Sequence, residues 1–373
     1  MTKVVDIRKS DDPRDAIFRA VHLLTEGKLV AFPADTTYFV AASALSTQGI
    51  HRLEKLMEHA DRPQASLVVK STQEAMDYVP NMPAVGRKLT RRCWPGPVIF
   101  DFAVDANEGL FKALPEATQR VLTPHDTISL RVPAHHFAIS SLKRLPSPLV
   151  ASPEVLNGSG PATTAEEVLD RLGGEIDLII DDGPSRYGDV STVVHVTDEK
   201  WSVMSQGVVT ETMIGRLASE VYLFVCTGNT CRSPMAEGLF RKILSERLKC
   251  SEDELFDRGY MVASAGLSAH SGAPASPEAV TLLTQRGIDL STHASQPITD
   301  PMLDQTDHIY TMTSAHRDAL LGVRPDLADR VQLLARDNSD ISDPIGGSFE
   351  VYKTCQREIE SHVTAIVNDI PLQ

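Results

Sequence analysis

The sequence predicts two α/β domains, and the second is expected to hold a four-stranded, parallel, Rossmann-like sheet. Its 373 residues are too many for one ordinary domain and suit two. Strand and helix patterns intermix in the first part, which favours an α/β or α+β domain. In the second part four strands alternate with helices, which favours parallel pairing. We place the domains at residues 1–210 and 220–373, with a linker at 211–219.

The first domain shows both strand and helix patterns. Strands are predicted at residues 29–32, 66–69, 98–102, 127–131, 149–151, 178–180 and 192–195. Helices are predicted from Asp12-Pro13 to Gly27, around Ile50–Leu56, over Thr72–Tyr78 and Pro83–Arg92, and from a capping box at Thr164–Glu167 to Leu172. A rigid turn is expected at residues 94–97.

The second domain shows a simpler alternation. Its strands are predicted at residues 221–225, 261–263, 308–312 and 331–334, and its helices begin at Ser233-Pro234 and Ser276-Pro277, cover 315–321, and end with an apolar stripe from Phe349 to Ile366. Parallel sheets bind ligands at the carboxyl ends of their strands. We therefore expect the functional site where the first of these strands ends, at Cys226.

The segment from Val221 to Glu237 carries the chemistry. A strand leads into a short polar loop, and Ser233-Pro234 is a typical helix N-cap and first-turn pair. A loop at a helix N-terminus binds anions. Cys226 opens the loop and Arg232 follows after five residues, so a thiolate would lie below a phosphoryl group held by a guanidinium fork. This arrangement predicts catalysis through a phosphocysteine. The alternative is a buried strand-end cysteine before an ordinary helix cap.

The run Cys226-Thr-Gly-Asn-Thr-Cys-Arg-Ser-Pro-Met-Ala-Glu237 resembles the signature loop of low-molecular-weight protein-tyrosine phosphatases. The resemblance covers about Val221 to the C-terminus and includes Asp343-Pro344, whose aspartate it implies to be the general acid. It also implies that Asn229 holds the strained loop and that Ser233 donates to the thiolate. Phosphate-facing N–H groups would come from Thr227, Gly228, Thr230, Cys231, Arg232 and Ser233.

Two residues of this region have two readings each. Cys231 could trap an oxidised Cys226 as a disulfide, or it is a packed free thiol. Ser264 belongs to the family's polar network behind the loop, or it forms a turn.

The substrate is expected to be phosphoarginine or phosphotyrosine in a protein. Thr230 and Ile345-Gly346-Gly347 resemble the arginine phosphatases of this family, because tyrosine-specific relatives carry an aliphatic residue and aromatic residues there. Arsenate reductase is less favoured, since no cysteine lies between Ser251 and Thr354. A non-catalytic phosphate-binding scaffold is disfavoured by the intact Cys226, Arg232 and Asp343. We expect no cofactor and no metal for this activity.

The first domain resembles YrdC-like domains of the threonylcarbamoyl-AMP synthase family. The matching stretches are Pro33–Tyr38, Trp94–Pro97, Ser129–Pro133, Asn157–Glu167 and Ser191–Val194. The resemblance implies an α/β twisted open sheet, covers roughly residues 10–210, and implies ATP, L-threonine and bicarbonate as substrates. Its candidate ligand-binding residues here are Thr37, Arg62, Arg131, Asn157 and Ser191.

Several family positions differ in this chain. The usual lysine is missing from Glu58–Pro63, the usual serine from Pro153–Asn157, and the final arginine from Met204–Gly207, while Phe39 replaces a glycine. Lost charged contacts would weaken a triphosphate site. We therefore expect a degenerate domain with a binding or regulatory role. The alternative is an active L-threonylcarbamoyladenylate synthase in tRNA modification.

The composition limits which binding partners and which cellular compartment we expect. The net charge of −14 argues against broad nucleic-acid binding, so tRNA is expected only indirectly, through the synthase alternative. Five cysteines suit a reducing cytoplasm, and no apolar run is long enough for a membrane span. The oligomeric state cannot be predicted from these features.

Overall fold

The structure is a computed structural model that describes residues 1–9, 12–58, 65–105, 108–124, 126–152, 160–198 and 200–371. The chain divides into two compact units, Met1–Leu217 and Ala218–Gln373. This division falls inside the predicted linker, where helix α8 (Glu211–Ala218) lies. Within the described ranges, no helix combines the length and apolar character that a bilayer crossing requires.

The first unit is built on a ten-stranded mixed sheet in the order β1-β8-β2-β3-β7-β4-β6-β5-β9-β10. Its strands are β1 (Lys3–Asp6), β2 (Val30–Phe32), β3 (Phe39–Ser43), β4 (Ser66–Val68), β5 (Val98–Ala103), β6 (Thr127–Arg131), β7 (Leu149–Ser152), β8 (Leu178–Asp181), β9 (Thr192–Val196) and β10 (Trp201–Ser205). Arg131, at the end of β6, contacts the segment that joins β2 to β3, and β7 pairs with β3.

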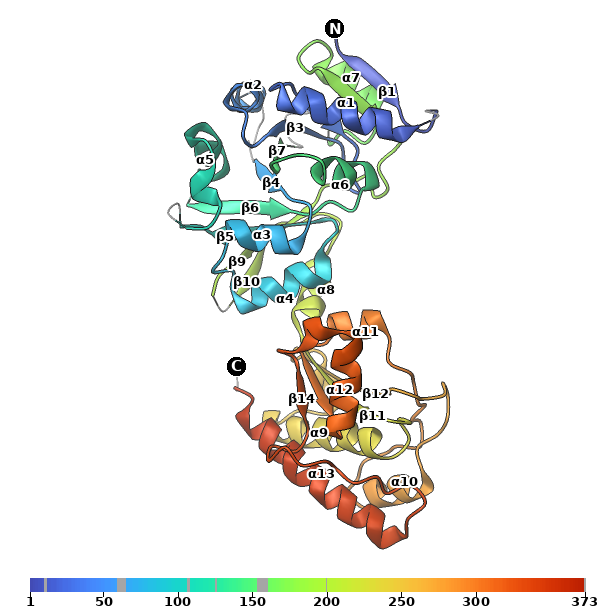
Figure 1. The fold of residues 1–373 in the computed structure, drawn as a ribbon. Helices are drawn as coiled ribbons and strands as arrows, with labels where there is room; N and C mark the ends of the chain where they lie inside the picture. Colours follow the sequence, from blue (N-terminus) through green and yellow to red (C-terminus); the bar gives the residue numbers. More distant parts are fainter. Residues whose placement is uncertain are drawn as a thin grey trace. The chain divides into compact units, whose positions relative to one another are not determined.

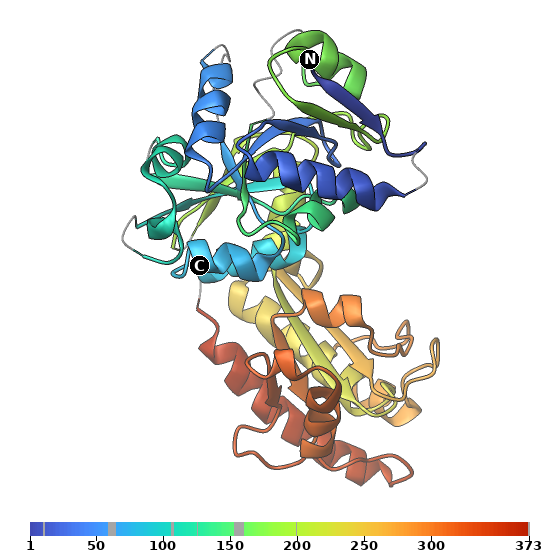
Figure 2. The ribbon, with the colours of Figure 1, turned by 45° about the horizontal axis from the view of Figure 1, so that its top comes forward.

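The helices of this unit are α1 (Pro13–Thr25), α2 (Thr47–Met57), α3 (Thr72–Tyr78), α4 (Ala84–Cys93), α5 (Glu116–Leu122), α6 (His136–Leu142) and α7 (Ala165–Leu172), with a 3₁₀ turn at Phe111–Ala113. The capping box predicted at Thr164 is present. Helix α1 packs on β2 and β3, and its residues share one apolar cluster with α6 (Figure 2).

The second unit holds a four-stranded sheet in the order β12-β11-β13-β14, and every pair in it is parallel, as predicted. Its strands are β11 (Glu220–Cys226), β12 (Tyr260–Gly266), β13 (His308–Thr311) and β14 (Val331–Leu333). Its helices are α9 (Arg232–Leu248), α10 (Pro277–Thr284), α11 (Asp300–Gln305), α12 (Ser314–Val323) and α13 (Phe349–Asp369), with 3₁₀ turns at Asp253–Leu255 and Pro325–Leu327.

Both faces of this sheet are covered by helices (Figure 1). Tyr222 and Phe224 of β11 point to a core shared with α9, α10 and α13, whereas Leu223 and Val225 point to a second core with α11 and α12. This alternation follows from the two-residue period of a strand. It buries β11 on both sides and fixes the position of its last residue, Cys226.

The sequence patterns miss six elements, namely β1, β3, β10, α5, α6 and α11. Strand β1 is short and half exposed at a sheet edge, so no apolar alternation marks it. Strand β3 begins at Phe39, the bulky residue that replaces a glycine of the family pattern. In the structure the Phe39 ring stacks on Phe32, with centroids 5.6 Å apart, and belongs to the core.

Candidate active site

The candidate site lies at the carboxyl end of the second unit's sheet, where β11 ends at Cys226. In the register, Cys226 pairs with Gly266 of β12, and Val225 pairs with Thr311 of β13. Residues 227–231 form the loop that leads into α9. The loop is tied to the end of β12, because Leu267 N–H and Ser268 N–H donate to the Cys226 and Thr227 carbonyls at 3.0 and 2.9 Å.

The Cys226 sulfur receives two polar contacts from the loop. The Asn229 N–H donates to Sγ at 3.2 Å, and the Ser233 hydroxyl lies 2.9 Å from it. Ser233 Oγ accepts a hydrogen bond from the Asn229 side-chain amide at 3.0 Å, and its own proton has two acceptors in reach, the sulfur at 2.9 Å and the more distant Ala265 carbonyl at 3.4 Å. Two hydrogen-bond donors directed at one sulfur would stabilise a negative charge on it.

The backbone amides of the loop form an anion-binding concavity. Within the described part of the chain, no hydrogen-bond acceptor is assigned to the N–H groups of Gly228, Thr230, Cys231, Arg232 and Ser233. These N–H groups belong to residues 228 and 230–233, at the N-terminus of α9, whose dipole also favours an anion. These are five of the six residues predicted to face a phosphate.

The role of Ser233 at the start of α9 differs from the predicted one. It was predicted to cap the helix, but α9 begins at Arg232, with Cys231 in the N-cap position and no side-chain cap. The hydroxyl of Ser233 instead faces Cys226 and Asn229. A capping side chain would accept a hydrogen bond from one of the first backbone N–H groups of α9, which here stay available to an anion.

Asn229 holds the loop in its bent conformation. Its φ is 55°, in the left-handed region, and the residue is fully buried. Its side-chain oxygen accepts from Gln296 N–H at 2.9 Å, which orients the amide so that its nitrogen donates to Ser233 and, at 2.8 Å, to Ser264. His293 Nε2 lies 2.8 Å from the Asn229 carbonyl oxygen.

Ser264 belongs to the polar network behind the loop and not to a turn, because it lies within β12. It donates to Glu237 Oε2 at 2.6 Å, and burial raises the pKa of the Glu237 carboxyl. Sequence reasoning missed Glu237, His293 and Gln296 as partners of the loop. His293 and Gln296 lie 64 and 67 residues from Asn229 along the chain, and Glu237 joins the network through Ser264, 27 residues further on, so only the folded structure brings them together.

Arg232 and Asp343 form an ion pair beside the loop. The Arg232 guanidinium is 4% exposed and also donates to the Ile341 carbonyl at 3.1 Å. The Asp343 carboxylate is more open, with 40% of its side chain exposed, and accepts from Ile345 N–H at 3.2 Å. The structure thus brings the two predicted charged groups together across 111 residues of sequence.

The loop's side chains have further partners on α12 and α13. Thr227 Oγ1 lies 2.8 Å from His316 Nε2, a contact that no sequence pattern indicated. Cys231 Sγ lies 3.4 Å from the Tyr352 hydroxyl, and burial raises the pKa of Tyr352 to about 12. Cys231 is therefore packed, which matches its reading as a buried free thiol.

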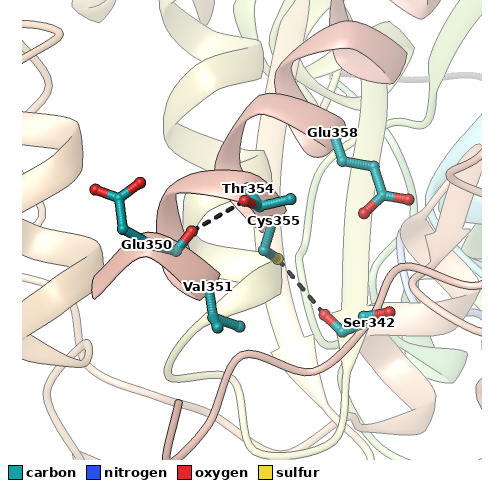
Figure 3. A pocket seen from close by; sticks show the side chains of 6 residues that line it. All are labelled: Ser342, Glu350, Val351, Thr354, Cys355 and Glu358. Atoms are coloured by element: carbon teal, nitrogen blue, oxygen red, sulfur yellow. Dashed lines mark hydrogen bonds between the residues drawn. The ribbon is translucent and has the colours of Figure 1, made fainter. Parts of the chain in front are cut away.

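Asp343 is carried by a loop that rests on α13. Figure 3 shows the Cys355 thiol pointing at the Ser342 carbonyl, to which it donates across 3.6 Å. Burial raises the pKa of Cys355 to about 12, so it stays a thiol and a donor. A cleft of about 320 Å³ opens beside this contact, lined by Ser342, Glu350, Val351, Thr354, Cys355 and Glu358. Ile345, the predicted specificity residue, is 68% exposed after Asp343.

The first unit gathers some of its predicted ligand-binding residues. Arg131 donates to Asp35 Oδ1 at 2.8 Å and to Thr36 Oγ1 at 2.9 Å, and Thr36 Oγ1 lies 3.3 Å from Ser191 Oγ. Thr36, which was not predicted, thus links the predicted residues Arg131 and Ser191, while the predicted Thr37 is buried beside it in the chain. Arg62 and Asn157 lie outside the described residues, as do most positions of the lysine and serine departures.

The buried cluster leaves two polar atoms unsatisfied. Among the described residues, Asp35 Oδ2 and Arg131 Nε have no hydrogen-bond partner. Buried polar atoms are normally paired, so unpaired ones close together indicate room for a polar ligand or water. Across the described chain, no group of three or more His, Cys, Asp or Glu side chains is placed to hold a metal ion.

Comparison with known proteins finds a similar family for each unit. Residues 22–207 match the Sua5/YciO/YrdC family, described as telomere recombination, and residues 221–372 match the low molecular weight phosphotyrosine protein phosphatases. The protein-arginine-phosphatase of Geobacillus stearothermophilus is 34% identical over 152 residues, which cover 40% of this chain and 94% of that protein.

The first unit has relatives of its own. The threonylcarbamoyl-AMP synthase of Pyrococcus abyssi is 30% identical over 200 residues, which are 53% of this chain. This chain spans only 55% of that synthase. A solved structure of Sua5 from P. abyssi matches 71% of this chain and 92% of its own, with a TM-score of 0.51 and 20% identity, which supports the predicted fold of the unit.

A Gly266→Ala variant tests how closely the loop depends on the end of β12. A Cβ at residue 266 would lie 2.6 Å from the Thr227 carbonyl oxygen and 3.0 Å from Asn229 N, so the loop must move. We expect destabilisation of about 1–3 kcal/mol and at least a tenfold loss of p-nitrophenyl phosphate turnover. Gly322→Ala in α12 is the control, because its added Cβ meets nothing within 4 Å. Equal activity of both variants would contradict this dependence.

Proposed function

Because this chain belongs to the low molecular weight phosphotyrosine protein phosphatase family through residues 221–372, we propose that it removes phosphoryl groups from arginine side chains of proteins by way of a phosphocysteine. One observation carries the proposal. The Cys226 sulfur sits among unpaired loop amides, with Arg232 and Asp343 beside the same loop. This set supplies a nucleophile, an anion site and an acid.

In the first step the Cys226 thiolate attacks phosphorus, and the bond from phosphorus to the guanidino nitrogen breaks. Asp343, protonated at this point, gives its proton to the leaving nitrogen. The loop amides and the Arg232 guanidinium bind the three phosphoryl oxygens and their developing charge. The bound phosphoryl group replaces Asp343 as the partner of Arg232, which frees the acid to face the leaving group.

In the second step water hydrolyses the phosphocysteine. The Asp343 carboxylate takes a proton from the water, the water oxygen bonds to phosphorus, and the bond from phosphorus to sulfur breaks. Inorganic phosphate and the Cys226 thiolate are the products. The Ser233 hydroxyl, directed at Sγ by the Asn229 amide, stabilises the departing thiolate.

Two features support phosphoarginine as the substrate, with phosphotyrosine as the alternative. The Thr230 hydroxyl lies 3.7 Å from the position of a Cβ built on Gly228 and 3.6 Å from Cys231 Sγ, so a polar group stands at this point of the loop. Ile345 and two glycines follow Asp343 in place of aromatic rings. A phenyl ring favours aromatic walls, whereas a polar guanidinium suits a hydroxyl and a carboxylate. The relative from G. stearothermophilus is named a protein-arginine-phosphatase.

We propose that the first unit binds a small polar ligand and has a binding or regulatory role, without synthase activity. Arg131 is committed to Asp35 and Thr36, so its charge is already neutralised inside the unit. ATP and L-threonine are the first ligands to test, because the relative from P. abyssi is named a threonylcarbamoyl-AMP synthase. The alternative, an active synthase, rests on the same relative. We also propose that the chain acts in the cytoplasm and does not bind nucleic acid directly.

The nucleophile and the acid are tested by two substitutions. Cys226→Ser is expected to lower p-nitrophenyl phosphate turnover at least about a thousandfold, because no phosphocysteine can form. Asp343→Asn is expected to cost about 10²–10⁴-fold, since the leaving group loses its acid. The control is Asp318→Asn, an exposed aspartate of α12. Unchanged turnover in Cys226→Ser would refute the proposed nucleophile.

The substrate is tested by Thr230→Ile. An aliphatic side chain removes the hydroxyl that borders the loop, so we expect the ratio of phosphoarginine to phosphotyrosine turnover to fall at least tenfold. The measurement is kcat/KM on two peptides that differ only in the phosphorylated residue. An equal ratio in variant and parent would remove Thr230 from the specificity argument, and a parent that prefers phosphotyrosine would establish the alternative substrate.

The role of the first unit is tested by an assay for its product. We expect the full chain to form no threonylcarbamoyl-AMP from ATP, L-threonine and bicarbonate, while a known synthase assayed in parallel does. Binding of ATP and of L-threonine is measured separately by calorimetry. Detection of the product would establish the synthase alternative, and failure to bind either molecule would exclude both as ligands.

A further inference from the structure

His316 of α12 connects the loop of residues 227–231, called the phosphate loop below, to the N-cap of α12. The residue is 8% exposed, and its ring lies between two threonine hydroxyls. Nε2 is 2.8 Å from Thr227 Oγ1, and Nδ1 is 2.9 Å from Thr313 Oγ1. Thr227 is the residue directly after the proposed nucleophile, and Thr313 is the N-cap of α12. Both ring nitrogens are therefore used in short contacts.

The same turn of α12 also holds the segment that carries Asp343. Asp340 Oδ1 accepts from Ser314 N–H at 2.6 Å, and Asp340 Oδ2 accepts from the Ser314 hydroxyl at 3.2 Å. The next residue, Ile341, receives the second hydrogen bond of Arg232. The start of α12 thus contacts the phosphate loop through His316 and the Asp343 segment through Ser314.

A neutral imidazole satisfies this geometry. It has one N–H donor and one acceptor nitrogen, so one threonine hydroxyl accepts from the ring and the other donates to it. Burial and the nearby Arg232 charge lower the pKa of His316, against the opposing effect of Asp343 and Asp340. The ring therefore adds a hydrogen-bonded link and no charge beside the phosphate.

We propose that His316 is a positioning residue that fixes Thr227, and with it the first turn of the phosphate loop, relative to the segment that carries Asp343. The proposal rests on the proposed phosphatase function and adds a determinant of the site's geometry. Thr227 is then held from two sides, by His316 at its hydroxyl and by Ser268 N–H at its carbonyl. Loss of the His316 contact leaves the side chain of Thr227 without its partner, so the loop binds phosphate less well.

Two substitutions separate the ring's contacts. The amide nitrogen of asparagine reaches about as far as Nδ1, and that of glutamine reaches about as far as Nε2. His316→Gln can therefore keep the Thr227 contact, whereas His316→Asn keeps only the Thr313 side. His308→Asn is the matched control, because His308 lies at the opposite end of β13 and pairs with Glu220.

The experiment measures the dissociation constant of inorganic phosphate by calorimetry and its inhibition constant against p-nitrophenyl phosphate, with unfolding temperatures for every variant. We expect His316→Asn to weaken phosphate about tenfold, the usual effect of one lost hydrogen bond. His316→Gln should recover most of that loss, and His308→Asn should change it less than twofold. Thr227→Val should match His316→Asn, and their double variant should be no weaker than either.

Several outcomes would overturn the proposal. If asparagine and glutamine weaken phosphate equally and in step with unfolding temperature, His316 has only a structural role. If the losses of Thr227→Val and His316→Asn simply add, the two residues do not act together. The calorimetric measurement needs no turnover, so it decides the role of His316 even if Cys226→Ser shows that the proposed mechanism is wrong.

Discussion

The second unit's site depends on the left-handed backbone of Asn229. An L-residue adopts this conformation at a cost, and here the cost is offset because every polar atom of the side chain is used. The resulting bend brings the Asn229 N–H onto the Cys226 sulfur and leaves the following amides without acceptors. The anion-binding shape of the loop is thus fixed before any ligand arrives, which is the usual requirement for electrostatic catalysis.

The sheet supplies the rigid base that this bend needs. Strand β11 is buried on both faces, and the next strand, β12, binds the loop's first two carbonyls through its own C-terminal extension. Behind the loop, Ser264 and Glu237 continue the hydrogen-bonded network into α9. Asp343 is held less firmly, on a segment fastened by the Cys355 thiol and by Ser314, and its carboxylate remains the most exposed of the three proposed catalytic groups.

The sequence was sufficient for the parts of this structure that local patterns control. The strand, loop and helix around Cys226, the four parallel strands and the Thr164 capping box are of this kind, and the structure confirms them. Edge strand β1 and buried strand β3 were missed, because neither has a clean apolar alternation. The partners His293, Gln296 and His316 were missed because their contacts are set by tertiary structure. The catalytic roles of Cys226, Arg232 and Asp343 stay predictions that activity measurements must test.

The pairing of Arg232 with Asp343 has a consequence for selectivity. The guanidinium already has an anionic neighbour from its own chain, so an incoming anion competes with that carboxylate for the positive charge. A singly charged ion such as chloride offers little advantage over a carboxylate already in place. A phosphate dianion brings twice the charge and several oxygens for the waiting amides. The ion pair therefore favours a phosphate dianion over a small singly charged anion.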